Sequence, residues 1–335
     1  MPGGELTIGN KDYAVHGQQN FEILQRDRSA NNDGQYTSAK VHSGLTYQWG
    51  KINDDADVSN RYSNPLEYGL TAIGERMFFI IPNSAVYAGT NSLYELDFSQ
   101  DSKSREVAKI DLKTNGIKTF SNPETNIEVL GLESVGDQLA VIMSVEGKLV
   151  VRGYDSVSGK LTGEVSVDDV NIDGIHLRPT NQLKIVTPLH STLYQAYSDT
   201  ESGTLNLKFD VMSYRANGQN VTFVSLDLHN GVKLVSNITA SFNNPKESVR
   251  DLVGIVKVAY LQNHLYVIRM EEDESAANYK HLYVYVYDND DKLVYKGELV
   301  TTMNDDYATW SEDPEGYNSG KYSFFDKWAI TPLKK

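Results

Sequence analysis

The chain of 335 residues contains no cysteine. Disulfide bridges, thiolate metal centres and cysteine nucleophiles all require that residue, so the sequence excludes these three kinds of site. The absence leaves the compartment open, because many exported bacterial proteins lack cysteine as well.

Basic residues are scarce relative to acidic ones. The chain has 31 lysines and arginines against 45 aspartates and glutamates, which gives a net charge of −14. Binding to nucleic acid or to an anionic membrane surface depends on clustered Lys and Arg, so the charge balance argues against both partners. Apolar residues make up 40% of the chain, which is typical of a soluble globular protein.

Long apolar runs are also missing. No stretch approaches the roughly 18 apolar residues of a membrane span, so no transmembrane segment is expected. The N-terminal sequence MPGGELTIGN has neither the charged nor the apolar region of an export signal. We expect residues 1–10 to be a flexible or vector-derived start, joined to a mature exported sequence without its signal or lipid-anchor segment. A native cytosolic start is the alternative.

The sequence carries no familiar catalytic motif. It has no Gly-x-Ser-x-Gly elbow, no P-loop, no Gly-x-Gly-x-x-Gly and no His-Glu-x-x-His, and its seven histidines show no paired ligand spacing. A non-catalytic role is therefore favoured. Loops that are distant in sequence can still build a site in the folded chain, so enzymatic activity stays open.

What the sequence does contain is a repeated phrase. EVAKIDLKTNGIKTFSN (106–122) and FVSLDLHNGVKLVSN (223–237) share an apolar run, an Asp-Leu pair, a polar turn with Asn-Gly and a second apolar run. Weaker copies cover 147–167 and 281–300. Glycine turns between apolar runs predict β-hairpins. The aspartates at the ends of the first runs are Asp111, Asp155, Asp227 and Asp288.

A second phrase precedes each predicted hairpin. It reads ERMFFII (75–81), DQLAVIM (137–143), NQLKIVT (181–187) and NHLYVIR (263–269). Continuous apolar runs of this length indicate strands that are buried on both faces. Each phrase also follows another short apolar stretch, so a unit of four strands occurs four times.

Four-stranded units in tandem resemble the blades of the β-propeller superfamily, which pack around a central channel. The resemblance covers about residues 66–301 and includes no WD or kelch signature, so it indicates no specific family. It implies an all-β fold, a single domain over 1–335, and six blades, with five to eight open. Two packed sandwiches are the alternative.

Strand-like segments also lie outside and between the four units. A hairpin at 36–53 and the strand-like KYSFFDKWAITP (321–332) imply that strands from both ends close the ring. The runs STLYQAY and TLNLKFDVMSY (191–214) indicate either an insertion or a further, degenerate blade.

The segment DVNIDG matches the start of a calcium-binding loop. Asp169, Asn171 and Asp173 offer alternate oxygen ligands, and Gly174 allows the sharp turn. Thr180 stands where such a loop has its glutamate, so a polar turn between blades is the alternative. Calcium is the one cofactor that the sequence suggests.

The segment 304–328 combines aromatic rings with carboxylates. Rings that stack on the apolar face of a sugar, beside carboxylates that accept its hydroxyl hydrogens, form a typical glycan site. The aromatic residues could instead anchor the last blade. The predicted ligand-binding residues are Tyr307, Trp310, Glu312, Asp313, Glu315 and Tyr317.

Part of that segment, PEGYNSGKYSFF, is distantly similar to the acid-bearing Glu-Gly-Pro strand of five-bladed glycosidases. The resemblance implies a general acid at Glu315. The order here is Pro-Glu-Gly, however, and the sequence identifies no partner carboxylates for such a mechanism. We therefore assign no catalytic residue.

Together these features predict a non-catalytic binding propeller that is secreted, periplasmic or lipid-anchored at the cell surface. It would present one face of the ring to a glycan, another small ligand or a protein. A glycoside hydrolase-like enzyme and a scaffold for protein partners are the alternatives. A site is expected outside the repeats, in the loops around 53–65, 189–204 and 304–320.

Overall fold

The structure is a computed structural model of the whole chain. It describes residues 5–299 except for 17–19, 29–35, 43, 48–64, 83–86, 100–102, 113–126, 146–147, 172–193, 214–217, 244–253 and 273–279. The described residues form strands β1 to β21 and one helix of five residues, α1 (Pro65–Gly69). In this part of the chain, no helix has the length and apolar character needed to cross a membrane.

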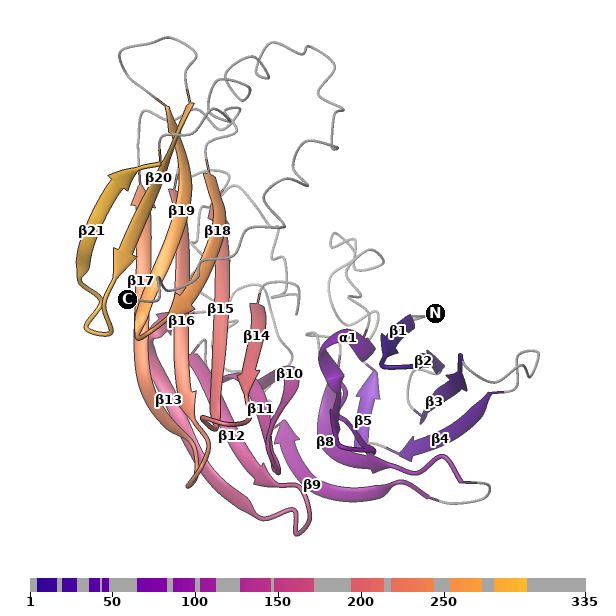
Figure 1. Cartoon of the computed structure of the whole chain (residues 1–335). Helices are drawn as coiled ribbons and strands as arrows, with labels where there is room; N and C mark the ends of the chain where they lie inside the picture. Colours follow the sequence, from indigo (N-terminus) through magenta and orange to yellow (C-terminus); the bar gives the residue numbers. More distant parts are fainter. Residues whose placement is uncertain are drawn as a thin grey trace. The chain divides into compact units, whose positions relative to one another are not determined.

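The strands form five sheets, and each sheet takes strands that follow one another along the chain (Figure 1). The first sheet contains β1 (Glu5–Ile8), β2 (Lys11–His16), β3 (Asn20–Asp27) and β4 (Thr37–His42). The second contains β5 (Gly44–Tyr47), β6 (Leu70–Ile73), β7 (Arg76–Phe79), β8 (Tyr87–Leu96) and β9 (Arg105–Leu112). The third contains β10 (Ile127–Val135), β11 (Gln138–Val145), β12 (Lys148–Asp155) and β13 (Leu161–Asn171). The fourth contains β14 (Tyr194–Asp199), β15 (Thr204–Ser213), β16 (Gly218–Asp227) and β17 (Lys233–Asn243), and the fifth contains β18 (Gly254–Leu261), β19 (His264–Glu272), β20 (Lys280–Tyr287) and β21 (Leu293–Glu298).

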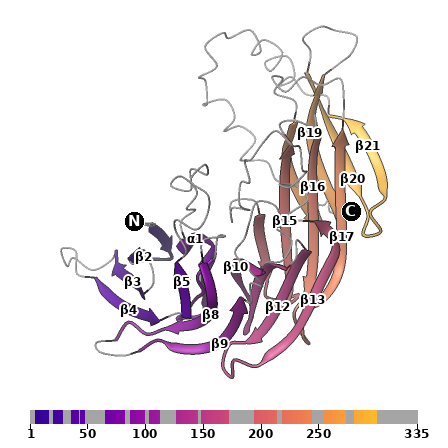
Figure 2. The ribbon, with the colours of Figure 1, turned by 180° about the vertical axis from the view of Figure 1, so that it is seen from behind.

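The predicted all-β fold and the four-stranded repeat of a β-propeller are confirmed. Strand pairing is antiparallel in the first, second, third and fifth sheets, as in propeller blades. Figure 2 shows β12 and β13 of the third sheet side by side from behind. Five sheets are described, so the count of six blades stays a prediction. Ring closure also stays a prediction, because 321–332 lies outside the described residues.

Two compact units divide the chain. One comprises Met1–Leu207 with Ser225–Val235, and the other comprises Lys208–Val224 with Ser236–Lys335. The first unit contains the first three sheets, and the second contains the fifth sheet. The fourth sheet contributes strands to both units. The single domain over 1–335 stays a prediction.

The first sheet is the main element that the sequence pattern missed. Residues 5–8, which were expected in a flexible start, form β1 and pair with β2. The strands of this sheet bury alternate residues, such as Tyr13 and Val15 on β2, so they lack the continuous apolar runs used to find strands. The predicted hairpin at 36–53 is wrong, because β4 pairs with β3 while β5 pairs with β8 in the second sheet.

Two copies of the predicted unit form sheets with the expected strand order. EVLGLES and DQLAVIM lie in β10 and β11, and GIVKVAY and NHLYVIR lie in β18 and β19. β11 is buried along nearly its whole length, as predicted for a strand covered on both faces. One apolar core extends through the first three sheets and includes residues of β11, which places these sheets face to face.

The prediction that Asp111 ends the first strand of a repeated hairpin is wrong. Asp111 lies in β9, the last of the four consecutive strands β6–β9, where it pairs with Thr90 of β8. The residue that follows β8, the third of these four strands, is Asp97. The place of EVAKIDL in the sheet follows from its pairing with β8. Its sequence similarity to the other predicted hairpins was misleading. The aspartates at the ends of the third strands in the five sheets are Asp27, Asp97, Asp155, Asp227 and Asp288.

The runs at 191–214 belong to a complete sheet. YQAYSD forms β14 and TLNLKFDVMS forms β15, and these are the first two strands of the sheet that ends its third strand at Asp227. The runs are therefore neither an insertion nor a degenerate extra blade. NQLKIVT, which was predicted as the buried strand of this unit, lies outside the described residues.

The aspartate at the end of the third strand closes the turn to the fourth. Asp155 Oδ1 accepts hydrogen bonds from the backbone N–H of Ser158 at 2.7 Å and from its hydroxyl at 2.6 Å. Asp227 Oδ1 accepts the N–H of His229 at 2.8 Å, so this carboxylate caps the turn that follows β16. Asp288 Oδ1 accepts two backbone N–H groups at 3.0 Å.

The same turns fasten a sheet to the sheet before it. Gly159 has a φ of +70°, and a Cβ atom at this position would overlap the carbonyl oxygen of Val107 on β9. Gly231 has a φ of +95°, and its Cβ would stand 2.8 Å from the carbonyl oxygen of Thr162 on β13. The glycines in the repeated turns are therefore needed both for the left-handed backbone and for the close approach.

The fifth sheet makes the equivalent contact with a side chain. Asp291 has a φ of +59°, and its Oδ1 accepts the backbone N–H of Thr239 on β17 at 2.8 Å. In each case a turn residue with positive φ contacts the outer strand of the preceding sheet. We call this contact the turn latch, and its members are Gly159, Gly231 and Asp291.

The turn latch predicts a difference between two glycine substitutions. Gly159→Ala adds both left-handed strain and a clash with backbone, so we expect a loss of about 2–4 kcal/mol in the free energy of unfolding. Gly9→Ala is the control, because Gly9 has a φ of +61° and no atom within 4 Å of its added Cβ. It should cost about 1 kcal/mol from strain alone. Urea denaturation measures both, and equal losses would contradict the latch.

Candidate functional site

The residues predicted from sequence as ligands lie largely outside the described part of the chain. Asp169 and Asn171 are in β13, where Asn171 pairs with Lys148, while Asp173 is not described. Among the described residues, no group of three His, Asp or Glu is placed to hold a metal ion. The calcium site stays a prediction. So does the C-terminal ligand site of Tyr307, Trp310, Glu312, Asp313, Glu315 and Tyr317.

Strands β6, β10 and β14 of three successive sheets are joined by side-chain hydrogen bonds. The Ser134 hydroxyl on β10 donates to the carbonyl oxygen of Ala72 on β6 at 3.0 Å. The Thr71 and Ser134 hydroxyls also lie 3.0 Å apart, and Thr71 is the donor because the Ser134 hydrogen is already used. The preceding residue of β10, Glu133, makes the corresponding contact with β14.

Glu133 and Tyr194 form the most unusual polar pair among the described residues. The Tyr194 hydroxyl donates to Glu133 Oε1 at 3.1 Å, and the tyrosine is 4% exposed. Its hydroxyl lies against Gly131, where any Cβ atom would overlap it. Gly131 therefore makes room for the phenol on β10, which explains a glycine in the middle of a buried strand.

Tyr68 of α1 completes the group. Its ring centroid is 5.7 Å from that of Tyr194, with the ring planes tilted by 59°. The backbone carbonyl of Tyr68 also lies near Gly131, at 3.0 Å from the position of an added Cβ. The strands β10 and β14 and helix α1 thus bring one carboxyl group and two phenol rings together. We call Glu133, Tyr194 and Tyr68 the Glu133 site.

The carboxyl group of Glu133 has an unusual protonation equilibrium. Burial raises the pKa of Glu133 to about 7, and the hydrogen bond from Tyr194 offsets only part of this effect. Burial also raises the pKa of Tyr194, and the neighbouring Glu133 charge raises it further. Near neutral pH, Glu133 therefore exists in both charged and uncharged forms, while Tyr194 keeps its proton.

Among the described residues, one oxygen of Glu133 has a hydrogen-bond partner. Tyr194 is the hydrogen-bond partner of Oε1, and within the described residues Oε2 has no partner. The side chain also keeps partial exposure to solvent. Its chemistry is that of a poorly hydrated carboxyl group with one oxygen available to a ligand.

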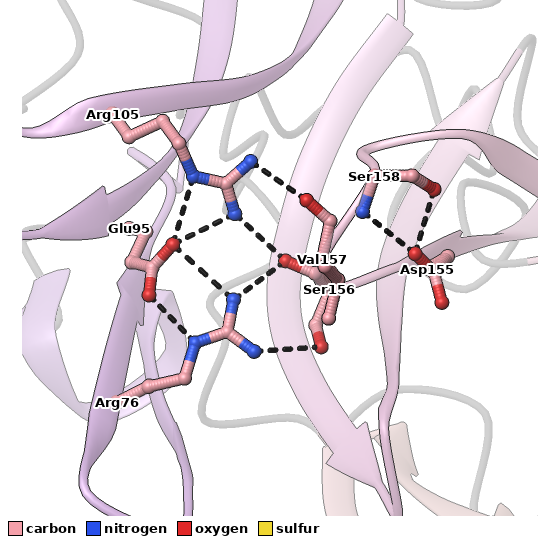
Figure 3. A network of polar contacts seen from close by, with 7 residues as sticks. All are labelled: Arg76, Glu95, Arg105, Asp155, Ser156, Val157 and Ser158. Atoms are coloured by element: carbon pink, nitrogen blue, oxygen red, sulfur yellow. Dashed lines mark hydrogen bonds and ion pairs between the residues drawn. The ribbon is translucent and has the colours of Figure 1, made fainter.

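A second polar cluster provides a comparison (Figure 3). Glu95 on β8 accepts from Arg76 Nε at 2.6 Å through Oε1 and from Arg105 Nε at 2.8 Å through Oε2. The guanidinium groups also donate to the carbonyl oxygen of Ser156 at 2.7 and 2.8 Å, and Arg105 donates to that of Val157 at 2.9 Å. The cluster ties the second sheet to the turn between β12 and β13.

The Glu95 cluster is a structural contact. Both oxygens of Glu95 have guanidinium partners, and the hydrogen bond from Arg76 is the main reason why the pKa of Glu95 is lowered. Its donors are directed at backbone oxygens of the neighbouring sheet, so no group is left for a ligand. This saturation distinguishes it from the Glu133 site.

Sequence reasoning missed the Glu133 site because it lies inside the repeat. The loops outside the repeats were expected to hold any site, whereas Glu133 belongs to EVLGLESV, a first strand. Two signals were present in that strand, an acidic residue within an apolar run and a glycine in its middle. Tyr194 was visible only as part of a strand-like run, because its contact with Glu133 depends on pairing between sheets.

Comparisons with known proteins give little beyond the fold. No family model matches the chain, and no curated protein matches it. A prolyl endopeptidase structure is similar at 10% identity and a TM-score of 0.37, over 88% of this chain and 33% of that one, so the chain spans about one third of that enzyme.

Two separate propeller domains also match. The β-propeller domain of the Trilobed protease from Pyrococcus furiosus has 8% identity and a TM-score of 0.34, over 89% of this chain and 84% of that one. The Nup133 β-propeller domain from Vanderwaltozyma polyspora has 9% identity and a TM-score of 0.28, over 90% and 86%. At these scores the likenesses carry no argument about function.

The raised pKa of Glu133 predicts that stability falls as pH rises. The folded protein holds a proton that the unfolded chain releases between about pH 4.5 and pH 7, so the free energy of unfolding decreases by up to about 1.4 kcal/mol per pH unit. Glu133→Gln should remove this decrease and raise stability at pH 8. Urea unfolding of both proteins from pH 4 to pH 8 measures the effect, and parallel curves would count against it.

Glu95 predicts the opposite pH dependence. Its lowered pKa means that the carboxylate stabilises the fold above about pH 4.5, and that this contribution is lost as pH falls. Glu95→Gln should cost about 1–2 kcal/mol at pH 7, since these side chains are partly exposed, and less near pH 3. Glu75→Gln, at an exposed turn residue, is the control and should change little. A loss in Glu95→Gln that does not vary with pH would argue against the carboxylate contribution.

Proposed function

We propose that the chain is a non-catalytic binding propeller whose small polar ligand contacts the Glu133 site. The observation that carries the proposal is the Oε2 atom of Glu133, which has no protein partner among the described residues. Burial raises the pKa of this carboxyl group to about 7, so a ligand group that bonds to Oε2 would stabilise its charged form. Perturbed carboxyl groups of this kind cluster at functional sites.

Binding is favoured over hydrolysis by the surroundings of Glu133. A glycosidase needs two carboxyl groups, about 5–5.5 Å apart for retention or 6.5–9.5 Å for inversion. The influences on the Glu133 pKa are burial and Tyr194, so no second carboxyl group of the described residues acts on it. A glycan remains one class of ligand within this proposal, since hydroxyl groups suit both Glu133 and the tyrosines.

We also propose that the protein works outside the cytoplasm, as a secreted, periplasmic or lipid-anchored surface protein. The support is a net charge of −14, which suits a soluble exported protein, and the lack of cysteine is compatible with this location. Neither feature depends on the Glu133 site, so fractionation of the native cells checks the location separately.

A ligand panel tests the binding function. We would titrate the protein by calorimetry with neutral sugars, amino sugars, amines and amino acids, and assay each disaccharide for released monosaccharide. We expect at least one compound to bind, to lose at least tenfold in affinity in Glu133→Gln, and to be left intact.

Tyr197→Phe is the matched control for this panel. Tyr197 is an exposed residue of β14 that donates only to Gln195 among the described partners, at 2.8 Å. Its loss should leave ligand binding unchanged. Cleavage of a disaccharide would favour the enzyme alternative. Binding that is the same in wild type and Glu133→Gln would place the ligand elsewhere.

A further inference from the structure

We propose that the ligand of the Glu133 site carries a small ammonium group, held by Glu133 Oε2 beside the rings of Tyr194 and Tyr68. The inference rests on the proposed function and deepens it by naming the chemistry of the ligand. Three features of the site support it: a carboxyl group with no countercharge among the described residues, two adjacent phenol rings, and one available oxygen.

The missing countercharge is apparent from the other carboxylates of the same unit. Asp12 receives a hydrogen bond from Arg26 at 2.9 Å, and Glu95 has two guanidinium partners. Within the described part of the chain, Glu133 has the neutral hydroxyl of Tyr194 as its one partner. A ligand that brings one positive charge would therefore complete the site in the way that arginine completes the other two.

The elements packed around β10 supply no such charge. The titratable group in contact with Glu133 is Tyr194 of β14, and Tyr68 of α1 lies against the ring of Tyr194. Strands β6 and β11 contain no ionisable residue. α1 also contains Glu67, an acidic residue whose side chain is outside the described part, so its sequence offers no cation either.

The aromatic rings favour an ammonium ion. A cation beside a tyrosine ring is attracted by the ring quadrupole, and the effect grows where water is excluded. The chain uses this contact elsewhere, since the Lys296 ammonium lies 4.7 Å from the ring centroid of Tyr283 and 4.8 Å from that of Tyr285. At the Glu133 site the ring of Tyr194 lies beside the carboxyl group that would hold the ammonium ion.

Other ligand classes fit less well. An anion would be repelled by the carboxylate and by the net charge of −14. A divalent metal needs several oxygen or nitrogen ligands, and the described residues hold no such group. A neutral sugar could bond to Oε2, but it would leave the carboxylate without a countercharge.

The proposal predicts affinity that increases with pH. A cation binds the charged form of Glu133, so binding displaces the proton. With a pKa of about 7, the charged fraction of Glu133 rises about thirtyfold between pH 5.5 and pH 8, and the affinity for a cation that binds only this form should rise by the same factor. A ligand that binds both forms of Glu133 equally would show no such increase.

The test uses choline, which stays charged at every pH, and 3,3-dimethylbutan-1-ol, its uncharged isostere. Calorimetric titration of wild type at pH 5.5 and pH 8 should show choline binding that strengthens about thirtyfold, and at least tenfold weaker binding of the isostere. Glu133→Gln should lose the choline affinity and its pH dependence. This variant is suitable because it removes an unfavourable buried charge and should fold at least as well as wild type.

Glu75→Gln is the matched control, because it removes the same charge from an exposed turn. It should bind choline as wild type does. Equal affinity for choline and its isostere, unchanged choline binding in Glu133→Gln, or no choline binding at millimolar concentration would each overturn the ammonium proposal. A neutral sugar from the ligand panel that binds in a Glu133-dependent way would then preserve the proposed function alone.

Discussion

The turn latch is the contact on which the order of the sheets depends. A flat edge strand alone does not fix where the next sheet packs along it. A backbone turn that contacts this strand at one residue does fix that position. Gly159 and Gly231 allow that approach because they have no side chain and tolerate positive φ. Asp291 reaches a similar result through a hydrogen bond. With this contact in place, the apolar core of the first three sheets can fill the space between them.

Polar side chains also join neighbouring sheets. Strands β6, β10 and β14 are joined through Ser134 and Glu133, while the Glu95 cluster joins the second sheet to the turn between β12 and β13. The two carboxyl groups differ in one respect that decides their roles. Glu95 is saturated by two guanidinium groups and stays charged, whereas Glu133 keeps an available oxygen and titrates near pH 7. A carboxylate whose two oxygens both have protein partners is typical of a structural contact. A ligand needs a carboxyl oxygen that can still accept a hydrogen bond.

The sequence allowed the fold class to be predicted because continuous apolar runs such as DQLAVIM identify strands covered on both faces. It failed for the first sheet, whose strands are covered on one side and alternate in polarity. Asp111 was predicted at the turn position that Asp97 occupies, and this error has a similar origin. A short sequence can repeat by itself, whereas the place of a strand depends on the strand with which it pairs. The Glu133 site could not be predicted for the same reason. Tyr194 is 61 residues from Glu133, and only packing between sheets brings them together.

The direction of the turn latch has a consequence for how the protein is made. In each of the three latches a later turn contacts an earlier strand, so the receiving surface is always synthesised first. Domains and motifs that leave the ribosome early can fold before the rest of the chain is complete. Each of these later sheets would therefore pack against a sheet that has already folded. Folding could then proceed from the N-terminus before the C-terminal residues are synthesised.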